Sequence, residues 1–293
     1  MAITGTGTKD DPYIVHSYDE LKEKYTKQDS STTNCYIKLA NDIDCNDFGD
    51  SWEWTAMERA YGSGSGNKYI DLDNHTIKNI MIKSGGSLFS DNIGSTHISN
   101  GKILNVFNSG ARTILENVRL NNISISVNGT NITFKAFYNV VFEKCAVYFK
   151  SNKLNNSVFY GNIYPYCKYS DFYLEINDKN EHPIFENYAM GSEAMTDCRV
   201  RGYVRGKSKN YYLVYGGTCA NSVIEMDTTN MTWDSTSSSR QPFYYQDKST
   251  GIINTEISPN LDNTGGLTAC TTAQMRDPDY LNSIGFVITK VGE

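Results

Sequence analysis

Residues 69–82 read YIDLDNHTIKNIMI and contain two short β-like runs separated by Asp-Asn-His-Thr. Apolar residues recur at every second position within the runs, at Ile70 and Leu72 before the break and at Ile80 and Ile82 after it. Alternation at period two is typical of half-buried strands, and Asn and Asp favour the backbone of tight corners. The stretch therefore predicts two strands joined by a polar corner.

Variations on this pattern recur as far as residue 257, in segments such as "LENVRL", "FEKCAVYF", "CKYSDFYLEI", "MTDCRVRGYV" and "CANSVIEM". Their spacing scatters around one or one half of a unit of roughly 24 to 28 residues, which is typical of a solenoid with variable loops. A hairpin protein would need frequent two-residue Asn-Gly or Asp-Gly turns, and these are scarce here. We therefore expect an all-β fold, a single right-handed parallel β-helix.

The ends of the chain differ from the middle in their sequence pattern. We expect an N-terminal cap over residues 1–68, β-helix coils over 69–266, and a C-terminal cap or tether over 267–293, because exposed strand edges need covering. Each cap should contain a short helix. In "SYDELKEKYTK", Ser17 is a candidate cap, and Leu21 and Tyr25 share one face at i, i+4. In "LTACTTAQMRDPDY", Thr271 or Thr272 is the candidate cap, and a turn and a final strand should follow.

Composition excludes several classes of protein. The 293 residues carry a formal charge of -6 without a dense basic run, which argues against a nucleic-acid partner. No apolar stretch is long enough for a membrane span, and no secretory signal opens the chain, so we expect synthesis in a cytoplasm. The seven cysteines form no CxxC pair, and the four histidines are scattered. We therefore expect free thiols in the core, no metal site and no cofactor.

Two pairs of acidic residues are the candidates for catalysis. Asp42 and Asp44, and likewise Asp71 and Asp73, lie two residues apart on one strand face. Paired carboxylates could perform acid–base chemistry on a polysaccharide. Both pairs lie in corner-like segments, where short polar side chains bind backbone groups, so we favour a structural role and expect no enzyme.

Clusters of aromatic residues are the candidates for binding. Amphipathic rings can stack on sugars or contact another protein, although they can equally pack in the coils or the caps. The candidate ligand-binding residues in "SWEW", "NYYLVY" and "PFYYQ" are Trp52, Trp54, Tyr211, Tyr212, Tyr244 and Tyr245.

The opening "GTGTKDDPYIVHSYDELKEK", the following "CYIKLANDIDCND" and "IDLDNHTIKNIMI", and the closing "LTACTTAQMRDPDYLNSIGF" resemble parallel β-helix proteins with GLUG-type repeats. Members of that group occur in bacteriophage virions and in bacterial surface adhesins. The missing secretory signal, the odd number of cysteines and a chain that is almost all β-helix favour a virion protein, a spike, fibre or decoration, that contacts other virion proteins or a host-surface glycan. The alternatives are a bacterial cell-surface adhesin and, third, a polysaccharide-degrading enzyme. The oligomeric state stays open, and a homotrimer is common among spikes of this architecture.

Overall fold

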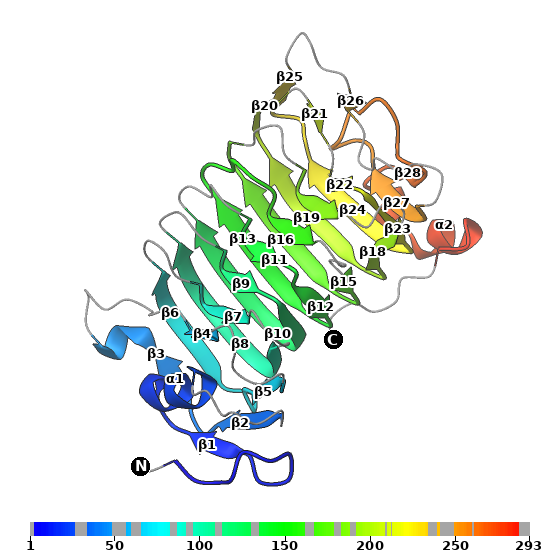
Figure 1. Ribbon diagram of the computed structural model, residues 1–293. Helices are drawn as coiled ribbons and strands as arrows, with labels where there is room; N and C mark the ends of the chain where they lie inside the picture. Colours follow the sequence, from blue (N-terminus) through cyan, green and yellow to red (C-terminus); the bar gives the residue numbers. More distant parts are fainter. Residues whose placement is uncertain are drawn as a thin grey trace.

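Short apolar runs and polar corners fold, in the computed structural model, into a parallel β-solenoid of about six turns with two short helices near its ends (Figure 1). The predicted parallel β-helix is thereby confirmed. The structure describes residues 3–26, 34–48, 57–59, 66–82, 87–91, 96–108, 113–129, 135–161, 167–178, 183–187, 192–208, 210–211, 213–233, 239–240, 249–259 and 261–286.

Sheet A is the larger sheet, and within the described residues it has 17 strands that pair in parallel. Its strands are β1 (Tyr13–Val15), β2 (Cys35–Leu39), β3 (Ile43–Asp44), β5 (Lys68–Asp71), β6 (Thr76–Ile82), β8 (Thr96–Asn108), β10 (Val118–Gly129), β12 (Val141–Glu143), β13 (Ala146–Ser151), β15 (Cys167–Lys168), β16 (Asp171–Ile176), β18 (Ser192–Thr196), β19 (Arg199–Val204), β23 (Gly217–Ala220), β24 (Ser222–Asp227), β27 (Gly251–Asn254) and β28 (Thr268–Cys270).

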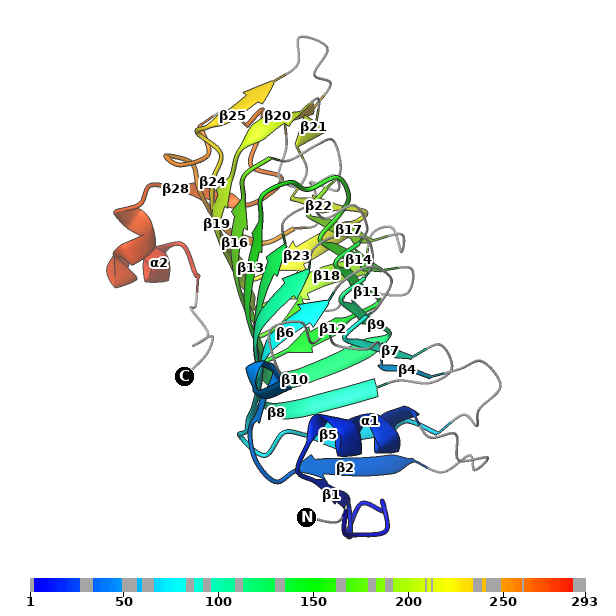
Figure 2. The same ribbon diagram turned by 90° about the vertical axis from the view of Figure 1, so that its left-hand side faces the viewer.

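Sheet B lies opposite sheet A across the core (Figure 2). It consists of β4 (Met57–Arg59), β7 (Phe89–Asp91), β9 (Leu115–Glu116), β11 (Phe137–Tyr138), β14 (Phe159–Gly161), β17 (Phe185–Asn187) and β22 (Val214–Tyr215). Two small pairs complete the strands, β20 (Gly206–Ser208) with β25 (Met231–Trp233) and β21 (Asn210–Tyr211) with β26 (Ser239–Arg240). The helical elements are α1 (Tyr18–Thr26), α2 (Pro278–Ser283) and the 3-10 turns η1 (Cys45–Phe48) and η3 (Gln274–Arg276).

A corner divides the coils of sheet A into two parts, and from the coil of β5 and β6 to that of β23 and β24 one or two residues at this corner have a positive φ. The predicted corner in "LDNHT" is of this kind, because Asp73 (φ 48°) and Asn74 (φ 65°) adopt the left-handed conformation. Asn and Asp reach it at low cost because their short polar side chains bond locally. Stacked coils align these positions into what we call the corner column: Asn74, Asn100, Asn122, Lys144, Tyr169, Asp197 and Asn221.

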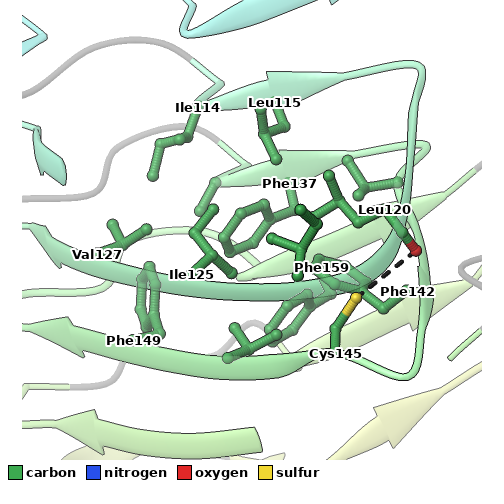
Figure 3. Packing of buried hydrophobic residues seen from close by; sticks show 14 of the residues in the cluster. Ile114, Leu115, Leu120, Ile125, Val127, Phe137, Phe142, Cys145, Phe149 and Phe159 are labelled. Carbon is green, nitrogen blue, oxygen red and sulfur yellow. Dashed lines mark hydrogen bonds between the residues drawn. The ribbon is translucent and has the colours of Figure 1, made fainter. Parts of the chain in front are cut away.

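The core is built from columns of inward side chains that repeat from coil to coil (Figure 3). In sheet B, Phe159 stacks on Phe137 and on Phe185, with ring centroids 5.1 Å and 4.4 Å apart. Phe142 and Phe172 approach these rings from sheet A at steep interplanar angles. Parallel, in-register pairing places like residues above one another, so the apolar positions of the sequence pattern become continuous columns.

Helix α1 closes the N-terminal end of the core. Ser17 Oγ accepts a hydrogen bond from Glu20 N at 3.3 Å, and Leu21 and Tyr25 are fully buried, as the sequence predicts. The Tyr25 hydroxyl bonds to Thr96 Oγ1 at 2.9 Å. Buried Lys68 donates from Nζ to the carbonyl oxygen of Lys24 at 3.1 Å, near the helix C-terminus, where cations are favourable.

The C-terminal segment differs in detail from the prediction. Thr271 Oγ1 does accept from Gln274 N at 3.1 Å, but it begins only the short turn η3. Helix α2 has its own cap, Asp277, followed by Pro278, whose ring suits the first helical position and cannot continue a preceding helix. The predicted final strand lies outside the described residues.

Helix α2 lies on the outer side of sheet A (Figure 2). Ile252 of β27 faces outward and packs with Met275, Leu281 and Phe286, whereas its neighbour Ile253 belongs to the main core. The segment therefore covers an apolar strip of the sheet. The division of the chain into caps and coils at residues 68 and 267 stays a prediction, although β1 and β2 already pair in parallel with sheet A.

All seven cysteines are free and buried. Burial raises the pKa of the Cys145, Cys198 and Cys219 thiols to about 12, so these side chains are protonated. The Cys145 thiol donates to the carbonyl oxygen of Glu143, and the Cys198 thiol donates in the same way to Thr196. The expectation of free core thiols is confirmed.

Candidate functional site

The aromatic residues selected from the sequence cannot be assembled into a site. Trp52, Trp54, Tyr212, Tyr244 and Tyr245 lie outside the described residues. Tyr211 lies on β21, beside Arg240 of β26, and only its backbone is described. Their role in binding stays a prediction.

The Asp42 and Asp44 carboxylates bind the next coil. Asp42 Oδ1 accepts from Thr76 N at 2.9 Å and lies 3.2 Å from His75 Nδ1. Asp44 Oδ1 accepts from Asn79 Nδ2 at 2.7 Å. The Thr76 amide holds the pKa of Asp42 below its ordinary value, and the Asn79 side-chain amide does the same for Asp44. Both carboxylates are thus ionised acceptors at corners.

The second acidic pair also makes contacts between coils. Asp71 Oδ1 accepts from Asp73 N at 2.9 Å and from Asn100 Nδ2 at 3.2 Å, while Asp73 pairs with Lys38 at 3.0 Å. Asn122 Nδ2 then donates to Asn100 Oδ1 at 3.1 Å, so a ladder of amides begins at the Asp71 carboxylate. These contacts are those that the structural interpretation expects, and the absence of a catalytic role for either pair stays a prediction.

The outer side of sheet A carries the most ordered group of functional side chains, here called the tyrosine face. It covers β13, β16, β19 and β24, whose alternate residues point away from the core. In-register pairing aligns these residues across the coils. Its members are Tyr148, Lys150, Asp171, Tyr173, Glu175, Arg199, Arg201, Tyr203 and Glu225.

Ring stacking organises one column of the tyrosine face. Tyr148 and Tyr173 stack with centroids 5.8 Å apart and an interplanar angle of 8°, and the Arg201 guanidinium lies 5.5 Å from the Tyr173 ring. Burial, followed by the neighbouring Glu175 carboxylate, raises the pKa of Tyr148. Because these rings face one another along the column, they present edges and hydroxyl groups outward.

Charges of the tyrosine face are paired between coils. Arg201 binds Asp171 through two nitrogens, at 3.2 Å and 2.8 Å. Arg199 contacts Glu225 at 2.5 Å, and Lys150 contacts Glu175 at 3.2 Å. Partly exposed pairs of this kind add little stability individually, but a bidentate arginine fixes side-chain orientation. The result is a rigid surface that is locally neutral and can form many hydrogen bonds.

A second stack lies at the N-terminal end of the outer surface. Tyr36, Tyr69 and His97 form a column with successive centroid distances of 4.6 Å. Burial, and then the positive charge of Arg119, lower the pKa of His97, so its ring is neutral at pH 7. The ring faces in this stack also contact one another, which favours rigidity over sugar stacking.

On sheet B, Glu116 and Glu186 flank the stacked rings of Tyr138 and Tyr160. Three strand spacings separate the two positions, about 14 Å at 4.8 Å per strand. Glycosidase carboxylates lie about 5 to 10 Å apart. Ser90 and Ser157 donate hydrogen bonds to Glu116 and Glu186, respectively, so both carboxylates are engaged within the solenoid.

The tyrosine face could have been detected in the sequence by alternation, although a search for clusters of aromatic residues does not find it. In "FEKCAVYF" and "CKYSDFYLEI", period-two alternation places Tyr148 and Tyr173 opposite the buried positions Phe149 and Phe172. Their stacking also requires the register between coils, which variable loops conceal.

Within the described residues, no three His, Cys, Asp or Glu side chains gather as metal ligands would. No helix in the described part of the chain is long and apolar enough to cross a membrane. No protein-family model, curated protein or solved structure matches the chain.

Proposed function

We propose that the chain is a structural protein of a bacteriophage virion, a β-helical spike, fibre or decoration that acts by contact with a host-surface glycan or with other virion proteins. The observation that carries the proposal is the tyrosine face, where Tyr148, Tyr173 and Arg201 stack across three coils and the neighbouring charges are paired. Such a surface is pre-organised, so binding costs little side-chain entropy.

The two ends of the sequence resemble β-helix proteins with GLUG-type repeats, a group that includes virion proteins. The seven free cysteines and a chain that is mostly β-solenoid support the virion among these. The same resemblance supports a bacterial cell-surface adhesin as the second candidate, because both kinds of protein need a rigid contact surface. A polysaccharide-degrading enzyme is the third candidate. The use of Asp42, Asp44 and Asp71 as corner acceptors argues against it, because a catalytic carboxylate must be available to the substrate.

Localisation tests the proposal directly. Antibodies against the purified protein should label intact phage particles, and mass spectrometry of density-purified particles should find the chain at a fixed copy number. Recovery from the envelope of uninfected bacteria, with none in particles, would refute the virion role and support the adhesin. Release of reducing sugar or unsaturated products from host polysaccharide would instead support the enzyme.

A further inference from the structure

Two members of the corner column do not suit its backbone conformation. Lys144 has φ 54° and Tyr169 has φ 50°, in consecutive coils, whereas every other member is Asn or Asp. The left-handed conformation raises the backbone energy of a residue whose side chain forms no local hydrogen bond, and long or bulky residues are uncommon there. Strain that neighbouring coils avoid indicates that these two side chains serve another purpose.

The same corner concentrates positive charge on a chain of net charge -6. Lys144 is exposed and has no ion-pair partner among the described residues. Lys168 Nζ lies 5.0 Å from the centre of the Tyr169 ring. Exposed Arg119 lies on the adjacent strand and is close enough to His97 to lower the pKa of that histidine.

The acidic groups at this corner are engaged. Glu143 Oε2 accepts from Asn121 Nδ2 at 3.0 Å, and Asp197 Oδ1 accepts from Asn221 Nδ2 at 2.6 Å. Lys168 lies in register with Glu143 of the preceding coil, whereas Lys144 follows Glu143 in the chain and is exposed to solvent. The tyrosine face is locally neutral, whereas this corner carries exposed positive charge. The corner is therefore suited to an anionic ligand.

We propose that Lys144, Lys168 and Tyr169 bind an acidic sugar unit of a glycan, one that carries a carboxylate or a phosphate. An ammonium group forms strong hydrogen bonds with such an anion, and the Tyr169 ring offers an amphipathic surface to a pyranose. This inference rests on the proposed surface-contact role and names the class of ligand.

Lys144→Asn separates binding from folding. Asn adopts the left-handed conformation readily, and its amide could donate to Asn122 Oδ1 as Asn122 donates to Asn100. The variant should melt about 2 °C higher than the parent protein, yet bind the acidic glycan about tenfold more weakly. Lys102→Asn is the matched control, because it removes an exposed lysine from β8, two coils away from Lys144.

Binding should be measured by calorimetry at low ionic strength with three probes. Polygalacturonate carries carboxylates, polyglycerol phosphate carries phosphates, and dextran is neutral. Binding to either anionic polymer, weakened by Lys144→Asn and unchanged by Lys102→Asn, supports the site and identifies its anion.

Equal weakening by both variants would reveal non-specific attraction and overturn the proposal. So would equal affinity for dextran, unchanged affinity in Lys144→Asn, or a lower melting temperature of that variant. A chain found in virions that binds neither anionic polymer would refute this site alone. A chain that binds an anionic polymer but occurs only in the bacterial envelope would refute the virion role alone.

Discussion

Ser170 is predicted to stabilise the solenoid by connecting two coils inside the protein. It follows the corner column, is fully buried, and alternates along the coils with Cys145, Cys198 and Ser222. Its hydroxyl donates to the carbonyl oxygen of Lys168 at 2.9 Å and accepts from Cys145 N at 3.1 Å. Ser222 repeats this arrangement, accepting from Cys198 N at 3.2 Å. Serine here is therefore both donor and acceptor.

Ser170→Ala removes the acceptor of a buried amide and leaves the rest of the corner in place. The Lys168 carbonyl keeps a second donor, Lys144 N at 2.9 Å, so the main loss is the bond of Cys145 N. An unsatisfied buried amide costs about 1–3 kcal/mol. At about 2 °C per kcal/mol for a chain of this size, the melting temperature should fall by about 2–6 °C. Ser170→Cys should cost less, because a thiol already occupies this column at Cys145.

Two measurements check this expectation. Urea unfolding followed by circular dichroism gives the change in unfolding free energy, and hydrogen exchange reports on the peptide that contains Cys145. Ser124→Ala, at a half-exposed outward position on β10, is the control. If Ser170→Ala matches that control within about 0.5 kcal/mol and Cys145 keeps its protection, the hydrogen bond between coils contributes nothing and the reasoning fails.

Three further predictions follow from buried or corner contacts. Tyr25→Phe should lower the unfolding free energy by about 1–2 kcal/mol in urea, because it loses the 2.9 Å bond to Thr96; no change would show that packing alone holds α1. Burial raises the pKa of the Cys145 thiol from an ordinary 9.0 to about 12, so this thiol ionises at lower pH in the unfolded chain than in the folded protein. The free energy of unfolding should therefore decline as the pH rises from 9 towards 12. A thiol reagent should react with all seven cysteines only after unfolding. Asp71→Asn should lower the free energy of unfolding by about 1 kcal/mol. The parent protein should leave pectin and alginate uncut. If the parent protein cleaved either polymer and the folded Asp71→Asn variant did not, Asp71 would be catalytic.

The local sequence pattern predicted the fold because each coil repeats the same arrangement of alternating buried residues and a polar corner. Leu72 and Ile77 alternate with polar neighbours and are fully buried, and the Asp73-Asn74 pair between them forms the left-handed corner. The predicted helix at Ser17 forms for a similar local reason. These features depend on residues within a few positions of one another.

Features that depend on register between coils could not be read from the sequence. The repeated segments do not all occupy the same place in a coil, because Cys145 and Ser170 share one column, whereas Val118 and Ser157 stand at other corners. Half-length steps in the repeat therefore reflect several corners in each coil. Tyr148 meets Tyr173 only because two loops of unequal length still bring their strands into register.

Stacking constrains the outer surface of a parallel solenoid more than that of an ordinary sheet. Each outward side chain has a neighbour about 4.8 Å away in the next coil, so like charges repel along a column. The tyrosine face avoids this repulsion by placing opposite charges together, as in Lys150 with Glu175 and Arg199 with Glu225. Lys168 follows the same rule, because it lies in register with Glu143 of the preceding coil. Exposed Lys144 stacks instead between Asn122 and Tyr169, and neither neighbour carries an opposite charge. A bound anion would supply the missing opposite charge at Lys144, so occupancy of the proposed site and stability of the two coils should rise together.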